Sequence, residues 1–133
     1  MNVAVLGASD KPERYSYKAV EMLAEKGHAV FPVHPAAASV AGRPVFKRLA
    51  DIAEPLDTIT VYLGAERSSA LADEIAAARP RRVIFNPGAE NPELFARLQS
   101  AGVEAVNACT LVMLRTGRFE RPAGGNAAQA TGR

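Results

Sequence analysis

The chain has 133 residues, of which 48% are hydrophobic and 23% charged, and its formal net charge is +2. These values are ordinary for a single globular domain, and so small a charge argues against a nucleic-acid-binding surface. The first apolar run is too short to span a membrane and lacks the regions of a signal peptide. The only cysteine, Cys109, cannot form an internal disulfide, so we expect a protein of the reducing cytoplasm.

The chain begins with a short apolar run at residues 2–7, which predicts a buried β-strand. Small and turn-prone residues follow at positions 7–10. A helix is expected from Ser16 to Lys26, with Ser16 as its N-cap and Gly27 as its C-cap. A buried strand, a tight turn and a helix in this order are typical of the start of a nucleotide-binding α/β domain.

The rest of the chain repeats this alternation of strands and helices. Four further apolar or β-branched runs predict strands at residues 29–33, 58–63, 82–85 and 103–106. Helical patterns predict helices at residues 67–78, 92–102 and 110–115, and one or two helical turns between residues 47 and 53.

Strands that alternate with helices predict a mostly parallel sheet covered on both faces, here a Rossmann-like three-layer α/β sandwich with five strands. Because the crossovers are right-handed, we expect the strand order 3-2-1-4-5. The folded domain is expected to occupy residues 1–120. Residues 121–133 are rich in glycine, alanine and polar side chains without an apolar period, which predicts a disordered tail.

Ligands of such a sheet bind beyond the carboxyl ends of its strands. The segments expected there are Gly7-Ala8-Ser9, His34-Pro35, Leu63-Gly64, Asn86-Pro87-Gly88 and Asn107-Ala108-Cys109. In the first segment, the backbone N–H groups of the turn and of the following helix are suited to bind phosphate, and Lys11, Arg14 and Lys18 would add positive charge. The alternative is that this turn only connects a strand to a helix.

The ligand is not expected to be NAD. Residues 7–12 are GASDKP and lack the second and third glycines of the dinucleotide fingerprint, G-x-G-x-x-G. The fingerprint also places an acidic residue at the end of the second strand, where this chain has Val33-His34-Pro35.

A resemblance to a known family rests on four segments, which are GAS…RYSYKAVEMLAEKGHAVFPVHP, GRPVFKRLADI, LDTITVYL and VIFNPGAENPELFARLQSAGVEAVNAC. In order and spacing they resemble the CoA-binding domain family, small stand-alone Rossmann-like proteins of bacteria that are similar to the CoA-binding domain of succinyl-CoA synthetase. The resemblance covers about residues 2–114. It implies coenzyme A or an acyl-CoA as the ligand.

The resemblance also implies which residues bind the cofactor. They are the phosphate-binding turn Gly7, Ala8 and Ser9, the region of Arg14, Tyr15 and Ser16, the ribose and 3′-phosphate segment Val33, His34 and Pro35, and the later positions Leu63, Asn86 and Gly88. Some of these depart from the family pattern: His34 replaces the usual Asn, Leu63 replaces a frequent Arg, and Asn86 replaces Gln. The family's Arg-x-Ser-Tyr region is matched approximately, because Tyr15 precedes Ser16, and Ser16-Tyr17 is the alternative counterpart. Cys109 matches the cysteine that follows the family's fifth strand.

No catalytic or metal-binding residues are predicted, because the sequence shows no triad order, no carboxylate pair and no metal-ligand spacing. His34 and Cys109 are expected on opposite sides of the first strand, too far apart for a dyad. We therefore expect non-catalytic binding of coenzyme A or an acyl-CoA, without a nucleic-acid or membrane partner. Two alternatives stay open: a small enzyme that acts on a CoA ester or nucleotide, and a CoA-responsive regulatory or interaction protein. A homodimer or an unidentified protein partner also stays open.

Overall fold

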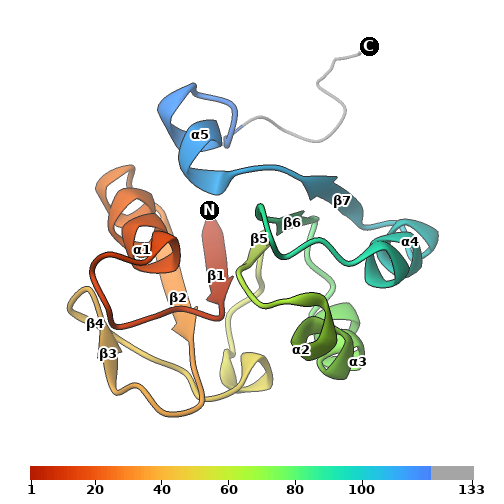
Figure 1. The fold of residues 1–133 in the computed structure, drawn as a ribbon, viewed down its shortest axis with the longest axis horizontal. Coiled ribbons are helices and arrows are strands. Elements are labelled where there is room, and N and C mark those ends of the chain that lie inside the picture. The colour runs from red at the N-terminus through yellow and green to blue at the C-terminus, as the bar shows by residue number, and fades with distance from the viewer. Residues whose placement is uncertain (121–133) are drawn as a thin grey trace.

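The computed structural model describes residues 1–120. Figure 1 shows one twisted sheet with helices on both faces. The five strands of this sheet are all parallel; they are β1 (Asn2–Leu6), β2 (Ala29–Val33), β5 (Thr58–Val61), β6 (Arg82–Phe85) and β7 (Glu104–Asn107). The prediction of a five-stranded parallel α/β fold is confirmed. The predicted tail, residues 121–133, lies outside the described residues.

The helices are α1 (Tyr15–Glu25), α2 (Ala65–Ala70), α3 (Ala72–Ala77), α4 (Pro92–Ser100) and α5 (Thr110–Arg115). A short 3-10 helix, η1 (Leu49–Asp51), forms the helical turn expected before the third strand. The helix predicted at residues 67–78 is divided at Leu71, whose ψ of 11° leaves the α-helical region. Between β2 and η1 the chain also forms a small hairpin of β3 (Ser39–Val40) and β4 (Arg43–Pro44), which the sequence patterns did not predict.

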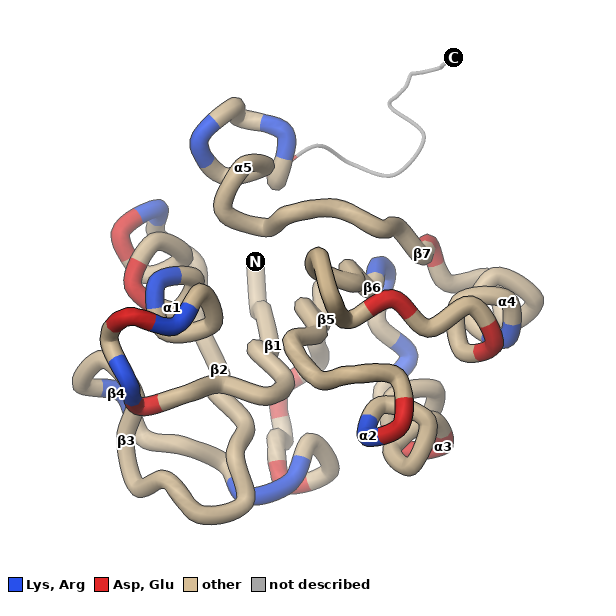
Figure 2. Tube along the Cα trace, in the orientation of Figure 1, with Lys and Arg blue, Asp and Glu red and all other residues tan. Residues whose placement is uncertain are grey.

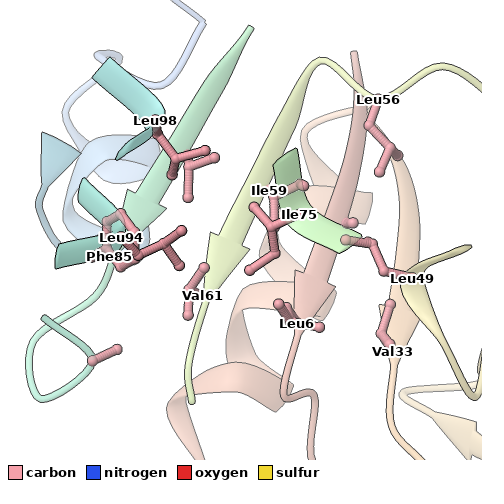
Figure 3. Packing of buried hydrophobic residues seen from close by; sticks show 13 residues of the cluster. Leu6, Val33, Leu49, Leu56, Ile59, Val61, Ile75, Phe85, Leu94 and Leu98 are labelled. Carbon is pink, nitrogen blue, oxygen red and sulfur yellow. The ribbon is translucent and has the colours of Figure 1, made fainter. Parts of the chain in front are cut away.

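The two faces of the sheet follow from the alternation of side chains along β1. Val3 and Val5 point to one face, where they pack with residues of α1 and α5. Ala4 and Leu6 point to the other face, where they pack with residues of η1, α3 and α4. Figure 3 shows this second cluster, with Ile75 of α3 lying over Ile59 of β5. These four side chains are at most 2% exposed, so β1 contributes to both core layers.

The predicted strand order is wrong. The observed order is β2-β1-β5-β6-β7, which is 2-1-3-4-5 when only the strands of the main sheet are counted. β2 is therefore an edge strand, and β5 pairs with β1 on the side opposite β2.

The reason for this order lies in Pro32, within β2. Proline has no N–H group to donate to a neighbouring strand, so it is confined to sheet edges. The carbonyl of Pro32 faces outward and accepts the N–H of Phe46 (2.9 Å), and His34 donates its N–H to the Phe46 carbonyl (2.9 Å). The loop between β2 and β5 thus covers the outer edge of β2, and the next strand must pair elsewhere.

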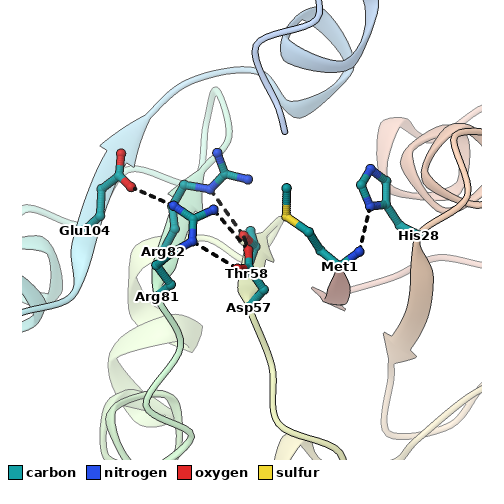
Figure 4. Close-up of polar contacts among 7 residues, drawn as sticks. All are labelled: Met1, His28, Asp57, Thr58, Arg81, Arg82 and Glu104. Carbon is teal, nitrogen blue, oxygen red and sulfur yellow. Dashed lines mark hydrogen bonds and ion pairs between the residues drawn. The ribbon is translucent and has the colours of Figure 1, made fainter. Parts of the chain in front are cut away.

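Polar side chains gather at the amino ends of the strands, the edge opposite the predicted ligand site. Figure 4 shows Arg81 bound to Asp57, with an Nε–Oδ2 distance of 2.9 Å, and paired with Glu104 on its other side over 3.5 Å. Arg82 is only 3% exposed and donates from Nε to Thr58 Oγ1 over 3.2 Å. Burial and the neighbouring Arg81 lower the pKa of Arg82.

The chain after α5 returns to this amino edge. Phe119 is fully buried, and its ring centre lies 4.5 Å from the guanidinium carbon of Arg82, while the ring packs edge-on to His28. Glu120 pairs with Nε2 of the same histidine over 2.8 Å. The Nη2 atom of Arg82 has no hydrogen-bond partner among the described residues, so the ring face of Phe119 is a major contact of this buried cation.

Candidate functional site

A pocket of about 530 Å³ lies at the carboxyl ends of β2, β1 and β5. In a sheet with this order, the connection after β1 leads to β2 on one side, whereas the connection after β5 leads to β6 on the other side. The crevice between two such connections is the usual ligand site. The lining residues are Leu6–Lys11, Arg14, Val33–Pro35, Lys47–Leu49, Tyr62, Leu63, Arg67, Leu71 and Glu74.

Most of the predicted cofactor-binding residues line this pocket. They are Gly7, Ala8, Ser9, Arg14, Val33, His34, Pro35 and Leu63. Four others do not line it, namely Tyr15, Ser16, Asn86 and Gly88. The structure therefore gathers the ends of the first three sheet strands around one pocket and leaves the end of β6 outside it.

The backbone N–H groups of the turn after β1 already have partners within the protein. Gly7 and Ala8 both donate to the Val33 carbonyl, over 3.2 and 3.1 Å. Ser9 donates its N–H to the hydroxyl of Ser16, and Lys11 donates its N–H to the hydroxyl of Ser9, each over 3.1 Å. These bonds fasten the turn to β2 and α1, and the predicted phosphate contact of its amides stays a prediction.

The amino end of α1 retains free donors. The N-cap of α1 is Arg14, not the predicted Ser16, and the Arg14 side chain makes no capping hydrogen bond. Backbone N–H groups in a first helical turn have no acceptor within the helix. Because α1 has 11 residues, its dipole also favours negative charge at this end.

Gly7 is required where the chain passes from β1 into the pocket wall. Its φ of +89° lies in the left-handed region, which favours glycine. A Cβ atom built at Gly7 would lie 2.8 Å from Cδ2 of Leu63 and 3.3 Å from the backbone carbon of Tyr62. The side chain of Leu63 thus packs directly against the turn and makes this part of the wall apolar.

His34 presents a defined donor. Its Nδ1 atom accepts the N–H groups of Ala36 (3.0 Å) and Ala37 (2.8 Å). In the neutral imidazole the proton is then on Nε2, because one ring nitrogen donates while the other accepts. His34 is half-buried in the pocket lining, so this imidazole can donate to an acceptor of a ligand.

The pocket lining is rich in positive charge. Its basic residues are Lys11, Arg14, Lys47, Arg48 and Arg67, and its acidic residues are Asp10 and Glu74. Figure 2 shows basic positions before α1 and at the start of α2.

Sequence reasoning missed three of these cations, Lys47, Arg48 and Arg67, because they lie far from the glycine turn in the sequence. It also placed Lys18 near the site, whereas Lys18 does not line the pocket and its Nζ atom lies 5.8 Å from the centre of the Tyr15 ring.

Glu74 holds two segments of the pocket together. Its Oε2 accepts the N–H of Ala50 over 2.7 Å and lies 4.0 Å from Nε of Arg48. The α3 side of the pocket is thereby fastened to η1. The other four basic residues of the lining are Lys11, Arg14, Lys47 and Arg67. Among residues 1–120, no carboxylate forms an ion pair with any of them.

Asn86 has a structural role at the end of β6. It is 2% exposed and donates from Nδ2 to Thr60 Oγ1 (2.7 Å) and to the Val61 carbonyl (2.9 Å). Its Oδ1 accepts the N–H of Thr110 over 2.9 Å. The amide thus joins β5, β6 and the start of α5. Nearby, burial raises the pKa of Tyr62, which also lines the pocket, to about 12.

The other predicted residues outside the pocket differ in exposure. Ser16 is buried and accepts from Ser9, whereas Tyr15 is 70% exposed. Gly88 is exposed and donates its N–H to Glu90 Oε1 over 3.0 Å.

Neither a catalytic dyad nor a metal centre is evident in the part of the chain that the structure describes. His34 follows β2 and Cys109 follows β7, at opposite edges of the sheet. Four strand spacings of about 4.8 Å, or roughly 19 Å, separate these edges. Residues 1–120 contain no group of three His, Cys, Asp or Glu side chains suited to hold a metal ion. None of the described helices is long and apolar enough to cross a membrane.

Comparisons with known proteins agree with this geometry. A crystal structure of an uncharacterized protein is 39% identical, covers 89% of this chain and 97% of that chain, and superposes with a TM-score of 0.84. A protein of Thermus thermophilus is 29% identical, with a TM-score of 0.81 and coverage of 89% and 90%. The uncharacterized protein YneT of Bacillus subtilis is 26% identical over 100 residues, which are 75% of this chain and 74% of YneT.

The family model described as "CoA binding domain" matches residues 1–115. These residues include all five strands of the main sheet and every residue of the pocket lining. The match confirms the resemblance found in the sequence, and the chain belongs to the CoA binding domain family.

Proposed function

We propose that the pocket binds coenzyme A or an acyl-CoA through its phosphate groups and performs no chemistry on it. The observation that carries this proposal is the charge of the pocket in a chain of the CoA binding domain family. Five basic and two acidic side chains line one cavity at the carboxyl ends of three neighbouring strands.

The chemistry of the ligand matches this charge. Coenzyme A carries a 5′-diphosphate and a 3′-phosphate, with roughly four negative charges at neutral pH. The cavity of about 530 Å³ lies within the range of small-molecule sites. It has room for the phosphorylated nucleotide, while the pantetheine arm extends beyond it.

The donors come from two sides of the turn. Lys11, Arg14 and the first-turn N–H groups of α1 supply charge and hydrogen bonds on one side. His34 donates from Nε2 at the end of β2. Gly7, Ala8, Ser9, Val33 and Pro35 shape the wall between them. Asn86 is left out of the proposed site because its amide is already bonded to protein groups.

The proposed lack of catalysis rests on the hydrogen bonds and positions of three potentially reactive side chains. Glu74, the half-buried carboxylate of the lining, is bonded to the Ala50 N–H. Nδ1 of His34 accepts two backbone N–H groups, which leaves it without a free lone pair to serve as a base. The thiol of Cys109 lies beyond the opposite edge of the sheet.

The test is a calorimetric titration of the purified chain with coenzyme A, acetyl-CoA, NAD and pantetheine. Coenzyme A and acetyl-CoA are expected to bind, whereas NAD and the phosphate-free pantetheine bind much more weakly. At a hundredfold excess over its dissociation constant, the ligand should raise the free energy of unfolding by about 2.7 kcal/mol.

No heat and no thermal shift at millimolar coenzyme A would reject the proposed binding. Consumption of acetyl-CoA by the protein, followed by mass spectrometry, would reject the proposed absence of catalysis.

A further inference from the structure

The end of β5 presents no charge to the pocket. Leu63 follows this strand, and its side chain packs against Gly7 so closely that a Cβ atom on Gly7 would lie 2.8 Å from Leu63 Cδ2. Any positive charge on this side of the pocket therefore has to come from another residue of the lining.

Arg67 is the basic residue of α2 in the pocket lining. It lies in the six-residue helix that follows β5 and is exposed to solvent. Several other arginines of the described chain are paired: Arg48 lies near Glu74, Arg81 near Asp57 and Arg97 near Asp73. Among residues 1–120, no carboxylate lies within ion-pair distance of Arg67.

We infer that Arg67 binds a phosphate group of the ligand from the α2 side of the pocket and supplies the charge that Leu63 lacks. This inference rests on the proposed function. Lys11 and Arg14 line the pocket from the opposite side, in the loop between β1 and α1. Coenzyme A has two separate anionic centres, and a pocket with cations on facing sides can contact both.

The guanidinium group is suited to this role because its planar fork donates two parallel hydrogen bonds to phosphate oxygens. The phosphate contacted by Arg67 is either the diphosphate or the 3′-monoester, and ligands that differ in these groups distinguish the two.

The test compares the full chain with three variants, Arg67→Gln, Arg67→Lys and Lys18→Gln. Lys18→Gln is the matched control because it removes the same charge from a residue outside the pocket lining. Each protein is titrated calorimetrically with coenzyme A, dephospho-CoA and pantetheine, and circular dichroism checks that each variant is folded.

Arg67→Gln is expected to weaken coenzyme A binding at least tenfold, while Lys18→Gln changes it less than twofold. Arg67→Lys should bind coenzyme A more tightly than Arg67→Gln but more weakly than the unaltered chain, because lysine keeps the positive charge and lacks the planar guanidinium group. If Arg67 contacts the 3′-phosphate, its effect disappears with dephospho-CoA; if it contacts the diphosphate, the effect remains. Either result supports the inference.

Equal affinities for Arg67→Gln and Lys18→Gln would overturn the inference while leaving the proposed function intact. If Arg67→Gln lost affinity for pantetheine, which has no phosphate, by the same factor as for coenzyme A, the inference would also be overturned. If the unaltered chain does not bind coenzyme A at all, the proposed function fails first and this inference fails with it.

Discussion

Replacement of Phe119 by alanine is predicted to destabilise the whole fold, although this residue lies beyond the segment matched by the family model, residues 1–115. Its side chain is fully buried and contacts both His28 and Arg82. Truncation of a buried Phe to Ala costs about 3–5 kcal/mol, and loss of the cation–π contact with a desolvated arginine adds to this cost. A domain of this size has roughly 5–15 kcal/mol of stability in total.

The assay is urea-induced unfolding, monitored by circular dichroism and compared with the control Val112→Ala. Val112 lies on α5, close to Phe119 in the sequence, but is 51% exposed. Phe119→Ala should lower the free energy of unfolding by at least about 3 kcal/mol, and the control should lower it by less than about 0.5 kcal/mol. A loss below about 1 kcal/mol for Phe119→Ala, with an unchanged urea dependence, would refute the view that residues 116–120 belong to the packed domain.

Three further predictions concern the turn, the polar network and the amino edge. Gly7→Ala should lower the unfolding free energy by more than the about 1–2 kcal/mol of left-handed strain, because the new methyl group meets Leu63. Asn86→Ala should lower the free energy of unfolding by about 1–3 kcal/mol for each buried polar group that it leaves without a hydrogen-bond partner. For Asp57, burial alone would raise the pKa, but the hydrogen bonds from Arg81 and Thr58 and the charges of Arg81 and Arg82 together hold the pKa below its usual value. This carboxylate therefore stabilises the fold above about pH 4, and its contribution is lost as the pH falls through the lower folded-state pKa. Asp57→Asn should flatten that acid dependence in urea-unfolding measurements.

The Gly7 and Asn86 predictions each have a matched control variant, and the Asp57 prediction is compared with the unaltered chain. Gly27 has a φ of +88°, but no other residue lies within 4 Å of the position that its Cβ atom would take, so Gly27→Ala measures the backbone strain alone. Equal losses for the two glycine variants would contradict the proposed contact. Asn107 is exposed, so Asn107→Ala should change the free energy of unfolding little. An equally small change for Asn86→Ala would contradict the structural role of Asn86. An equal loss of stability between about pH 5 and pH 2 in the unaltered chain and in Asp57→Asn would contradict the role of the Arg81 pair.

The fold class could be predicted because it follows from local sequence patterns. The apolar run of β1, the Gly7 turn and the Pro92 start of α4 depend on neighbours in the sequence. The strand order depends on which edge of β2 is free, and Pro32 was the one local signal for it. A proline within a strand excludes the interior position that the predicted order gave to β2.

The candidate site was only partly predictable for a similar reason. The residues at the strand ends could be found from the order of the elements. Lys47, Arg48 and Arg67 reach the pocket from a loop and from α2, and no sequence spacing shows that these segments face the same cavity. The bonds of the turn amides to Val33 and Ser16 depend on tertiary contacts, so sequence reasoning treated those amides as free.

The most direct measurement of the central claim is a titration of the ¹⁵N-labelled chain with coenzyme A, followed by amide-resolved NMR. The largest shifts are expected at Lys11, at residues 14–17 and around His34 and Arg67, which all lie at or beside the pocket. The amide signals of residues around Gly88 and in α4 should change their chemical shifts little. Shifts concentrated at the end of β6, or no shifts at saturating coenzyme A, would contradict the claim that the pocket between β2, β1 and β5 binds the cofactor.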